Sequence, residues 1–484
     1  MIRRLLLAFT FSLLIPVAAA AQPARTPPRN IVLILSDDHR FDFMSFVPGA
    51  PPFLRTPNLD RMAKGGAHVR NAMVTTALCS PSRASILTGQ YARRHGIVDN
   101  ASPIPAGTEF FPAQLQRAGY RTAYVGKWHM GEDSDAPQKG FDHWVSFRGQ
   151  GVYENPELNI NGDRRQIQGY TTDVLTDQAI DFLQKQSSAK SSQPFFLTLA
   201  HKAVHAEFVA SPRHRGTYAA ARVPYPETMA DTPANYEMKP RWVKEQRNSW
   251  HGVDFMYHGA MEFDGFYRAY CETLLGLDES VGRMLDYLDK SGLSQSTLVI
   301  YMSDNGFLLG EHGLIDKRNA YEESIRIPML AYAPGFVPAG SIVDQLVRNI
   351  DIAPTVLDLA GLRSDRPVDG RSVLGALRGD PAALDGEMVY EYYWEYAFPH
   401  TPTTLALRDD RYKFIYYPGV WDLQELYDVQ SDPKERRNLI AAPEHKARVE
   451  SMRKRLWDIL EMSGGMSVPL RRGSFQAIER KKDK

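Results

Sequence analysis

Four stretches of the chain share one pattern, a continuous run of apolar residues that ends abruptly in polar ones. They are residues 31–35, 122–125, 195–199 and 298–302, and most of their residues are Val, Ile, Leu, Phe or Tyr. A run without polar alternation is typical of a strand covered on both faces, as in a parallel sheet between two layers of helices. The pattern therefore predicts an α/β fold with a large, mostly parallel sheet sandwiched by helices.

Segments with helical periodicity separate these predicted strands. Apolar residues recur every three to four positions over 111–118, 172–186 and 266–288, and residues 56–63 carry the Thr-Pro start of a capped helix. Residues 205–262 follow no such period and are rich in aromatic residues, His and Pro. We expect a long irregular segment there.

The sequence changes character from about residue 376. Short runs at 388–393, 404–407 and 411–417 follow one another closely, with turn residues between them, as antiparallel strands do. A helical pattern over 445–462 closes this region. The pattern predicts a smaller C-terminal α+β subdomain that carries an antiparallel sheet.

The first residues match the three parts of a secretory signal peptide. Arg3 and Arg4 give a positive start, residues 5–17 are apolar, and residues 19–21 are the small residues of a cleavage site. We expect a periplasmic or secreted protein that no membrane holds after cleavage. The predicted organisation is a signal peptide (1–21), a large domain (22–375) and a C-terminal subdomain (376–484).

Charge and cysteine content narrow the classes of function. The 484 residues carry 57 basic and 57 acidic side chains, a balance that gives no reason to expect nucleic acid as a partner. Cys79 and Cys271 are the only cysteines, too few for a disulfide framework. A bridge between them would block a reactive Cys79, and the sequence leaves both readings open.

Polar residues directly follow each of the four predicted parallel strands. In a parallel sheet covered on both faces, ligands bind beyond the carboxyl ends of the strands. We therefore expect the following residues to gather along one edge of the sheet: Asp37, Asp38, Lys127, His129, His201, Asp304 and Asn305.

Four of these residues are hard oxygen donors. Asp37 and Asp38 follow the first strand and Asp304 and Asn305 the fourth, and carboxylates brought together repel unless a cation lies between them. Oxygen ligands favour Ca²⁺ or Mg²⁺ over zinc, and Ca²⁺ takes the larger number of donors. Single Asp residues also cap helices, but that alternative explains one pair more easily than two matching pairs. We therefore expect a calcium site.

The stretch around Cys79 has the features of a helix start that handles an anion. Pro81 suits the first helical turn and Gly89 the end, so that Cys79 lies at the N-terminal end, where unpaired N–H groups attract anions. Arg83, four residues later, is expected on the same face. The alternative is a buried, inert cysteine and an arginine on the surface.

Two motifs resemble the signatures of the type I sulfatases. Residues 79–83 fit C-x-P-x-R with Thr88-Gly89 behind them, and residues 119–129 fit G-Y-x-T-x-x-x-G-K-W-H. The resemblance implies an alkaline-phosphatase-like fold and conversion of Cys79 to formylglycine (3-oxoalanine) by a formylglycine-generating maturation enzyme. The hydrated aldehyde is the nucleophile of that family. The resemblance also implies a Ca²⁺ ion with these ligands: Asp37, Asp38, residue 79, Asp304 and Asn305.

The chemistry of a sulfate ester predicts which residues bind its anionic group. Attack at sulfur requires that the negative charge be screened, and Lys127 together with the cation and the helix start can do this. By resemblance, Lys317 is a second sulfate-binding lysine. Arg83 is expected beside the nucleophile at residue 79.

Three histidines are candidates for proton transfer and substrate contact. We assign His201 to protonation of the leaving alcohol and His129 to the hydroxyls at residue 79. His205 follows His201 by four residues and is expected to contact the substrate.

The segment 199–205, together with Asp316-Lys317-Arg318, looks like carbohydrate sulfatases of the N-acetylglucosamine-6-sulfatase kind. The resemblance implies a sulfated carbohydrate or polysaccharide as substrate. Two alternatives stay open, a phosphonate monoester hydrolase or phosphodiesterase of the same superfamily and a relative that binds sulfated glycans without catalysis. Weaker candidates for a sugar cleft are Tyr392-Tyr393-Trp394, His400-Thr401-Pro402, Trp250, His251 and His258.

Overall fold

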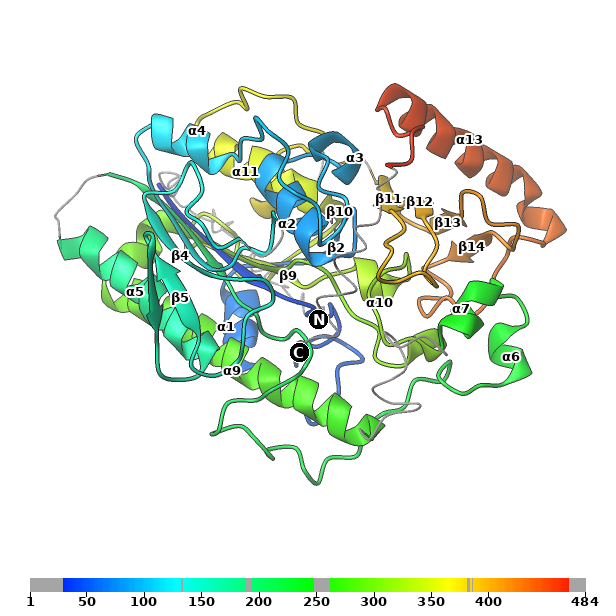
Figure 1. The fold of residues 1–484 in the computed structure, drawn as a ribbon, viewed down its shortest axis with the longest axis horizontal. Helices are drawn as coiled ribbons and strands as arrows, with labels where there is room; N and C mark the ends of the chain where they lie inside the picture. The colour runs from blue at the N-terminus through cyan, green and yellow to red at the C-terminus, as the bar shows by residue number, and fades with distance from the viewer. Residues whose placement is uncertain are drawn as a thin grey trace, which may run out of the picture.

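Two sheets organise the protein in a computed structural model, which describes residues 29–131, 134–188, 193–247, 262–380, 384 and 386–469 (Figure 1). The predicted signal peptide lies outside these residues. The large sheet consists of β1 (Asn30–Ser36), β2 (Ala67–Met73), β3 (Arg121–Lys127), β4 (His143–Phe147), β5 (Glu157–Ile160), β6 (Asp163–Gln166), β7 (Phe195–Ala200), β8 (Thr297–Ser303), β9 (Met329–Tyr332) and β10 (Ser341–Arg348). Its strand order is β10-β2-β9-β8-β1-β7-β3-β4-β5-β6.

The four strands predicted from apolar runs form the middle of this sheet. β8, β1, β7 and β3 are neighbours in that order, and each pair is parallel. Ile31 and Leu33 of β1 belong to one hydrophobic core, whereas Val32 and Ile34 belong to a second core on the opposite face. Both faces are therefore covered, which explains the continuous apolar pattern and confirms the predicted fold class.

Helices lie on both faces of the large sheet, as Figure 1 shows. The helices α1 (Pro57–Gly65), α5 (Thr171–Ser188) and α9 (Phe263–Lys290) cover one face. The opposite face carries α2 (Cys79–Thr88), α4 (Pro112–Arg117) and α11 (Ile352–Leu359). The four helices predicted from periodicity or from a helix start are confirmed as α1, α4, α5 and α9, with ends that shift by up to three residues.

Shorter helical elements connect these layers. They are α3 (Ala92–His95), α6 (Pro233–Tyr236), α7 (Arg241–Gln246), α10 (Glu322–Ile325) and α12 (Leu374–Leu377), with 3₁₀ turns η1 (Leu293–Ser296), η2 (Glu311–Gly313), η3 (Asn349–Asp351) and η5 (Pro443–His445). None of the helices in the described ranges combines the length and the apolar character that crossing a bilayer requires.

The second sheet is antiparallel, as predicted, and consists of β11 (Met388–Tyr392), β12 (Thr404–Arg408), β13 (Tyr412–Tyr416) and β14 (Glu425–Asp428). The closing helix α13 (Lys446–Met462) packs on β12 and β13. Tyr390 and Ile415 point the other way and belong to the core under α2 and α11. The two sheets thus share a core, and the domain boundary near residue 375 stays a prediction.

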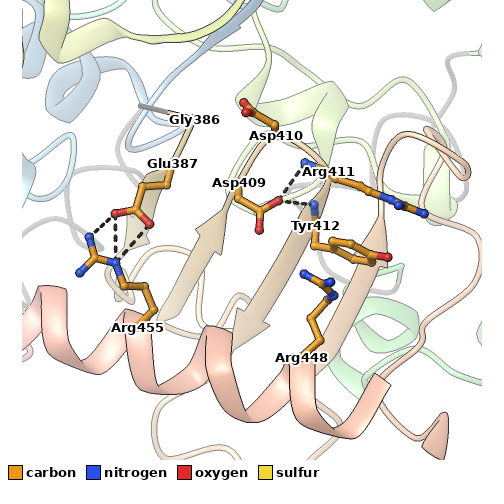
Figure 2. A pocket seen from close by; sticks show the side chains of 8 residues that line it. All are labelled: Gly386, Glu387, Asp409, Asp410, Arg411, Tyr412, Arg448 and Arg455. Carbon is orange, nitrogen blue, oxygen red and sulfur yellow. Dashed lines mark hydrogen bonds and ion pairs between the residues drawn. The ribbon is translucent and has the colours of Figure 1, made fainter. Parts of the chain in front are cut away.

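A hollow of about 780 Å³ lies where the second sheet meets α13 (Figure 2). The charges of Arg455 and Glu387 pair across it, and the guanidinium of Arg448 lies 4.0 Å from the centre of the Tyr412 ring. None of the residues that line this hollow is among the predicted site residues.

Candidate active site

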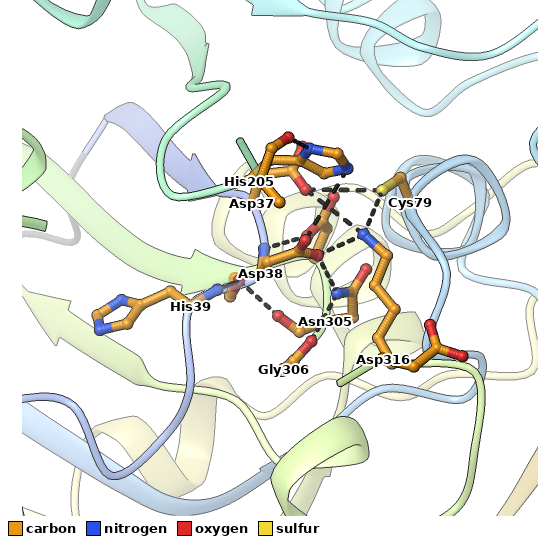
Figure 3. Close-up of polar contacts among 12 residues, drawn as sticks. Asp37, Asp38, His39, Cys79, His205, Asn305, Gly306 and Asp316 are labelled. Carbon is orange, nitrogen blue, oxygen red and sulfur yellow. Dashed lines mark hydrogen bonds and ion pairs between the residues drawn. The ribbon is translucent and has the colours of Figure 1, made fainter. Parts of the chain in front are cut away.

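The predicted site residues meet at the carboxyl ends of the central strands. Figure 3 shows Asp37 and Asp38 after β1, with Cys79 and Asn305 beside them. We call the following eight residues the edge cluster: Asp37, Asp38, Cys79, Arg83, Lys127, Asp304, Asn305 and Lys317. All eight are buried.

Helix α2 brings Cys79 into the edge cluster. The helix begins at Cys79 itself and ends at Gly89, whose φ of 70° is left-handed and whose N–H donates to the Ser85 carbonyl. The Cys79 Sγ lies 3.0 Å from Lys317 Nζ and 3.8 Å from Lys127 Nζ. Burial raises the pKa of the Cys79 thiol to about 12. An unmodified thiol here carries a proton at neutral pH and is a weak nucleophile.

Both cysteines of the chain are free thiols. Cys271 lies in α9, within the core on the opposite face of the sheet. A bridge between Cys79 and Cys271 is therefore absent from the described structure, and residue 79 is available for chemistry.

Arg83 ties α2 to three strand ends. Its Nε lies 2.9 Å from Asp304 Oδ2, its Nη2 lies 3.0 Å from Asp37 Oδ2, and its Nη1 donates to the Lys127 carbonyl at 2.6 Å. The side chain is almost completely buried. Arg83 thus positions both carboxylates relative to residue 79.

The three carboxylates of the edge cluster lie close enough to share one cation. Oxygen atoms of Asp37, Asp38 and Asp304 lie within 4.8 Å of one another. Arg83, Lys127 and Lys317 already balance this charge, so repulsion alone does not require a metal. The deciding observation concerns Asn305, because its Oδ1 is buried and has no hydrogen-bond partner among the described residues. A hard cation would give that oxygen the partner it lacks, and the set of oxygen donors fits Ca²⁺.

Each of the two lysines contacts a different carboxylate of the edge cluster. Lys127 Nζ contacts Asp37 Oδ2, and Lys317 Nζ lies 2.5 Å from Asp38 Oδ1. Burial lowers the pKa of Lys317, but Asp38 and its neighbours outweigh burial and hold the pKa well above its ordinary value. Burial also raises the pKa of Asp38 to about 7, with Asp37 and Asp304 adding to the effect. Lys317 is therefore a permanent cation beside residue 79.

His201 is the predicted site residue that the structure does not bring to the edge cluster. Its backbone N–H donates to the Leu35 carbonyl, so the ladder between β7 and β1 continues through this residue. Because side chains alternate along a strand, His201 faces the same side as Leu199, toward α9. Its Nε2 lies 2.9 Å from Ser280 Oγ in that helix. The predicted acid role of His201 does not fit this placement.

His205 takes the position that we assigned to His201. Its Nε2 lies 3.9 Å from Asp38 Oδ2, and it forms a tight group with Asp37 and Cys79 (Figure 3). Its Nδ1 contacts the carbonyl of Ala206, which only accepts, so Nδ1 carries a proton. In the neutral ring Nε2, which faces the cluster, therefore carries no proton and can accept one there.

His129 directly follows β3 at the same edge. The Ser80 hydroxyl donates to its carbonyl and ties it to the start of α2. Its Nδ1 is buried and has no hydrogen-bond partner in the described ranges. Burial and then Lys127 hold the pKa of His129 well below its ordinary value. The ring is neutral and keeps one nitrogen available.

The sequence matches the family profile described as Sulfatase over residues 29–362, more than half of the chain. This chain belongs to the sulfatase family. A second profile, described as N-sulphoglucosamine sulphohydrolase, C-terminal, matches residues 310–462.

Individual relatives match this sulfatase over most of their length. An N-acetylglucosamine-6-O-sulfatase of Bacteroides thetaiotaomicron is 32% identical, covering 93% of this chain and 90% of the relative. PehA of Trinickia caryophylli, a multifunctional alkaline phosphatase superfamily protein, is 28% identical, covering 87% and 93%. The solved structure of BT4656 in complex with its substrate D-glucosamine-2-N,6-O-disulfate matches with a TM-score of 0.82 at 30% identity, covering 92% and 99%. The chain is thus a sulfuric ester hydrolase with an alkaline-phosphatase-like fold.

Two residues at the site of this sulfatase escaped the sequence analysis. Gln150 Oε1 accepts a hydrogen bond from Lys127 Nζ at 2.5 Å, and it comes from the loop after β4, a strand that we did not predict. Lys202 lies between His201 and His205, inside a segment that we singled out for its histidines. The signal in the sequence that could have identified Lys202 is its position directly after a buried strand.

The weaker candidates for a sugar cleft have mixed outcomes. Tyr392 and Tyr393 are buried, whereas Trp394 is 46% exposed. His400 is exposed, and Thr401 is buried against Gln246. Trp250, His251 and His258 lie outside the described residues.

Proposed function

We propose that this sulfatase hydrolyses 6-O-sulfate esters of glucosamine or N-acetylglucosamine units in sulfated glycans. The name of the Bacteroides relative and the ligand in the matching solved structure support this substrate class. The observation that carries the proposal is the edge cluster, in which two lysines and three carboxylates surround residue 79. The similarity to the Bacteroides enzyme covers 93% of this chain.

The edge cluster is proposed to bind Ca²⁺ through Asp37, Asp38, Asp304 and Asn305. The grouped carboxylates and the unpaired Asn305 Oδ1 support this assignment. When bound, the ion supplies positive charge that neutralises the carboxylates and polarises a sulfate oxygen. Arg83 keeps Asp37 and Asp304 in place for it.

Residue 79 is proposed to act as formylglycine, produced by a maturation enzyme. The hydrated group supplies one hydroxyl that attacks sulfur and a second through which sulfate is released. Lys127 and Lys317, which flank residue 79, bind the anionic oxygens of the ester and hold the sulfur in line. The N-terminal end of α2, which begins at residue 79, adds the positive end of its dipole to this site.

Proton transfer is assigned to the two histidines that face the cluster. His205 protonates the leaving sugar alcohol through Nε2 after this nitrogen has taken up a proton at the site, because the Ala206 carbonyl holds the other ring proton on Nδ1. His129 exchanges a proton at residue 79 through its unpaired Nδ1. This assignment replaces His201, whose ring faces α9.

The chain is also proposed to act outside the cytoplasm after removal of residues 1–21. The charge, apolar run and small residues of that segment support export. N-terminal sequencing of the protein recovered from its host tests this point. A mature protein that begins near residue 22 is expected, and one that retains Met1 overturns it.

A substrate panel tests the proposed reaction. The protein is produced with a formylglycine-generating enzyme, supplied with Ca²⁺, and offered the 6-, 4- and 3-sulfates of N-acetylglucosamine and glucosamine together with a phosphonate monoester. We expect the highest kcat/KM on a 6-sulfate. A higher value on the phosphonate favours the alternative that similarity to PehA raises. If the protein turns over neither the sulfates nor the phosphonate, the catalytic assignment is overturned.

A further inference from the structure

Lys202 is a buried lysine without a counter-ion. It lies on the segment after β7, and its side chain is 6% exposed. Its Nζ lies 4.8 Å from the centre of the Tyr153 ring, and no described residue forms a hydrogen bond or an ion pair with it. Burial lowers the pKa of Lys202 to about 8, as expected for an ammonium group that has lost most of its water without gaining an anion.

The other buried lysines of the described chain all have polar partners, so Lys202 is an exception. Two of them contact carboxylates of the edge cluster, one lies between two glutamates, and one donates to a tyrosine hydroxyl. In order, these pairs are Lys127 with Asp37, Lys317 with Asp38, Lys413 with Glu322 and Glu435, and Lys239 with Tyr427. An unpaired buried charge is costly, so its position indicates a role in binding.

Lys202 lies at the margin of the edge cluster. Tyr153, whose ring faces its ammonium, donates through its hydroxyl to the carbonyl of His205 at 2.6 Å. The charges of Lys127 and Asp37 are close enough to shift the pKa of Lys202. The loop that carries Tyr153 also carries Gln150, and it lines a hollow of about 760 Å³. An anion bound at the cluster would therefore lie near this ammonium.

We propose that Lys202 is a third substrate-binding lysine, whose ammonium binds an anionic oxygen of the sulfated sugar. This inference rests on the proposed function. The oxygen belongs to the sulfate that is hydrolysed or to a second acidic group on the same sugar, and both offer the same chemistry. The substrate thus supplies the counter-ion that the folded chain lacks.

Three variants test this role. Lys202→Met removes the charge and keeps the apolar stem, Lys202→Arg keeps the charge, and Lys64→Met, at an exposed position of α1, is the control. Each is assayed for kcat/KM on N-acetylglucosamine 6-sulfate and on D-glucosamine-2-N,6-O-disulfate. Competitive inhibition by inorganic sulfate, sulfate binding by calorimetry and Tm are measured on the same samples.

We expect Lys202→Met to lower kcat/KM by about 10- to 100-fold, the usual loss when a charged hydrogen bond to a ligand is removed. Lys202→Arg should recover part of the loss and Lys64→Met should match the wild type. The Tm of Lys202→Met should not fall, because an unpaired buried charge is removed. A purely structural lysine would lower Tm instead.

The two substrates separate the two sources of the anion. Similar losses on both, with weaker inhibition by inorganic sulfate, assign Lys202 to the reacting sulfate. A loss confined to the disulfate assigns it to the second acidic group. Unchanged kcat/KM on both substrates, or a loss that follows a lower Tm and is not recovered by arginine, overturns the proposal. Calorimetry with inorganic sulfate tests Lys202 even where the wild type does not turn over either sugar.

Discussion

Two of the buried clusters of charged residues in the described parts of the chain differ in how their polar groups are paired. One is the edge cluster. The other, which we call the inter-sheet cluster, consists of Glu322 in α10, Arg408 in β12, Lys413 in β13 and Glu435. Lys413 Nζ lies 3.1 Å from Glu322 Oε1 and 2.6 Å from Glu435 Oε1. Arg408 Nε lies 3.4 Å from Glu322 Oε1. Each charge of the inter-sheet cluster has an opposite charge beside it.

The edge cluster is balanced in charge but leaves single atoms without partners. Asn305 Oδ1 in the cluster and His129 Nδ1 beside it are buried and have no hydrogen-bond partner among the described residues, and Lys202 lacks a counter-ion at the margin. Buried polar atoms are normally paired. Glu435 Oε1 of the inter-sheet cluster also lacks a hydrogen-bond partner among the described residues, but it keeps the ion pair with Lys413, whereas Asn305 Oδ1 has no opposite charge as a partner. The comparison teaches that buried charge alone does not identify a site. A buried oxygen such as Asn305 Oδ1, which has neither a hydrogen bond nor an ion pair among the described residues, is the better indication.

The largest expected effect concerns residue 79. Cys79→Ala should lower kcat/KM by about 10⁴-fold or more, as expected when a nucleophile is removed. Its Tm should stay close to that of the wild type, because α2 keeps its other contacts. Cys271→Ala is the matched control, since this second buried cysteine lies in the opposite core. Similar activity losses in both variants would contradict the assignment of Cys79.

The second effect separates His205 from His201. A good leaving group departs without a proton, so removal of the acid harms sugar sulfates most. His205→Ala should lower kcat/KM on N-acetylglucosamine 6-sulfate by about 10²- to 10⁴-fold, and much less on nitrophenyl sulfate. His201→Ala should change both substrates alike and lower stability, because the buried Ser280 loses one of its two hydrogen-bond partners and keeps only Thr176. A selective loss on the sugar sulfate for His201→Ala, with none for His205→Ala, would restore His201 as the acid.

The third effect tests whether the inter-sheet cluster contributes to stability alone and not to catalysis. Lys413→Met leaves Glu322 and Glu435 buried without their shared lysine, which should lower the free energy of unfolding by about 3–5 kcal/mol. The kcat of the folded protein should stay near the wild-type value. Denaturant unfolding and active-site titration measure the two quantities. Lys317→Met, the comparable change in the edge cluster, should instead lose kcat. If Lys413→Met is as stable as the wild type, the contrast between the two clusters disappears.

The smallest expected effect is the stability that Ca²⁺ adds. An ion that binds only the folded state at 100 times its Kd contributes about 2.7 kcal/mol. Chelation should therefore lower Tm, and Ca²⁺, rather than Zn²⁺, should restore both Tm and activity. Asn305→Ala should weaken this response, because it removes the unpaired oxygen. A Tm and an activity that both survive exhaustive chelation would argue against a metal in the edge cluster.

The central fold and the sheet edge were predictable because their signals are local. The apolar runs at β1, β3, β7 and β8 mark strands covered on both faces, and the polar residues behind them mark the edge. The short strand β4 carries no such run. Without it, the loop that presents Gln150 to Lys127 could not be placed.

The direction of side chains beyond a strand was not predictable from the sequence. His201 and His205 follow the same strand four residues apart, and both fit a catalytic role on sequence. The hydrogen bond from His201 N–H to the Leu35 carbonyl extends the ladder and turns His201 toward α9. That bond depends on the neighbouring strand. The missing partner of Lys202 likewise becomes visible only when every neighbour is placed.

The central claim is that residue 79 is the modified nucleophile of a glycan sulfatase. The measurement that tests it most directly is the mass of the peptide that contains residue 79, taken from the same preparation whose release of sulfate from N-acetylglucosamine 6-sulfate has been quantified. The account predicts a peptide lighter than its cysteine form, in proportion to the active fraction. A fully active preparation that retains the intact thiol at residue 79 would contradict it.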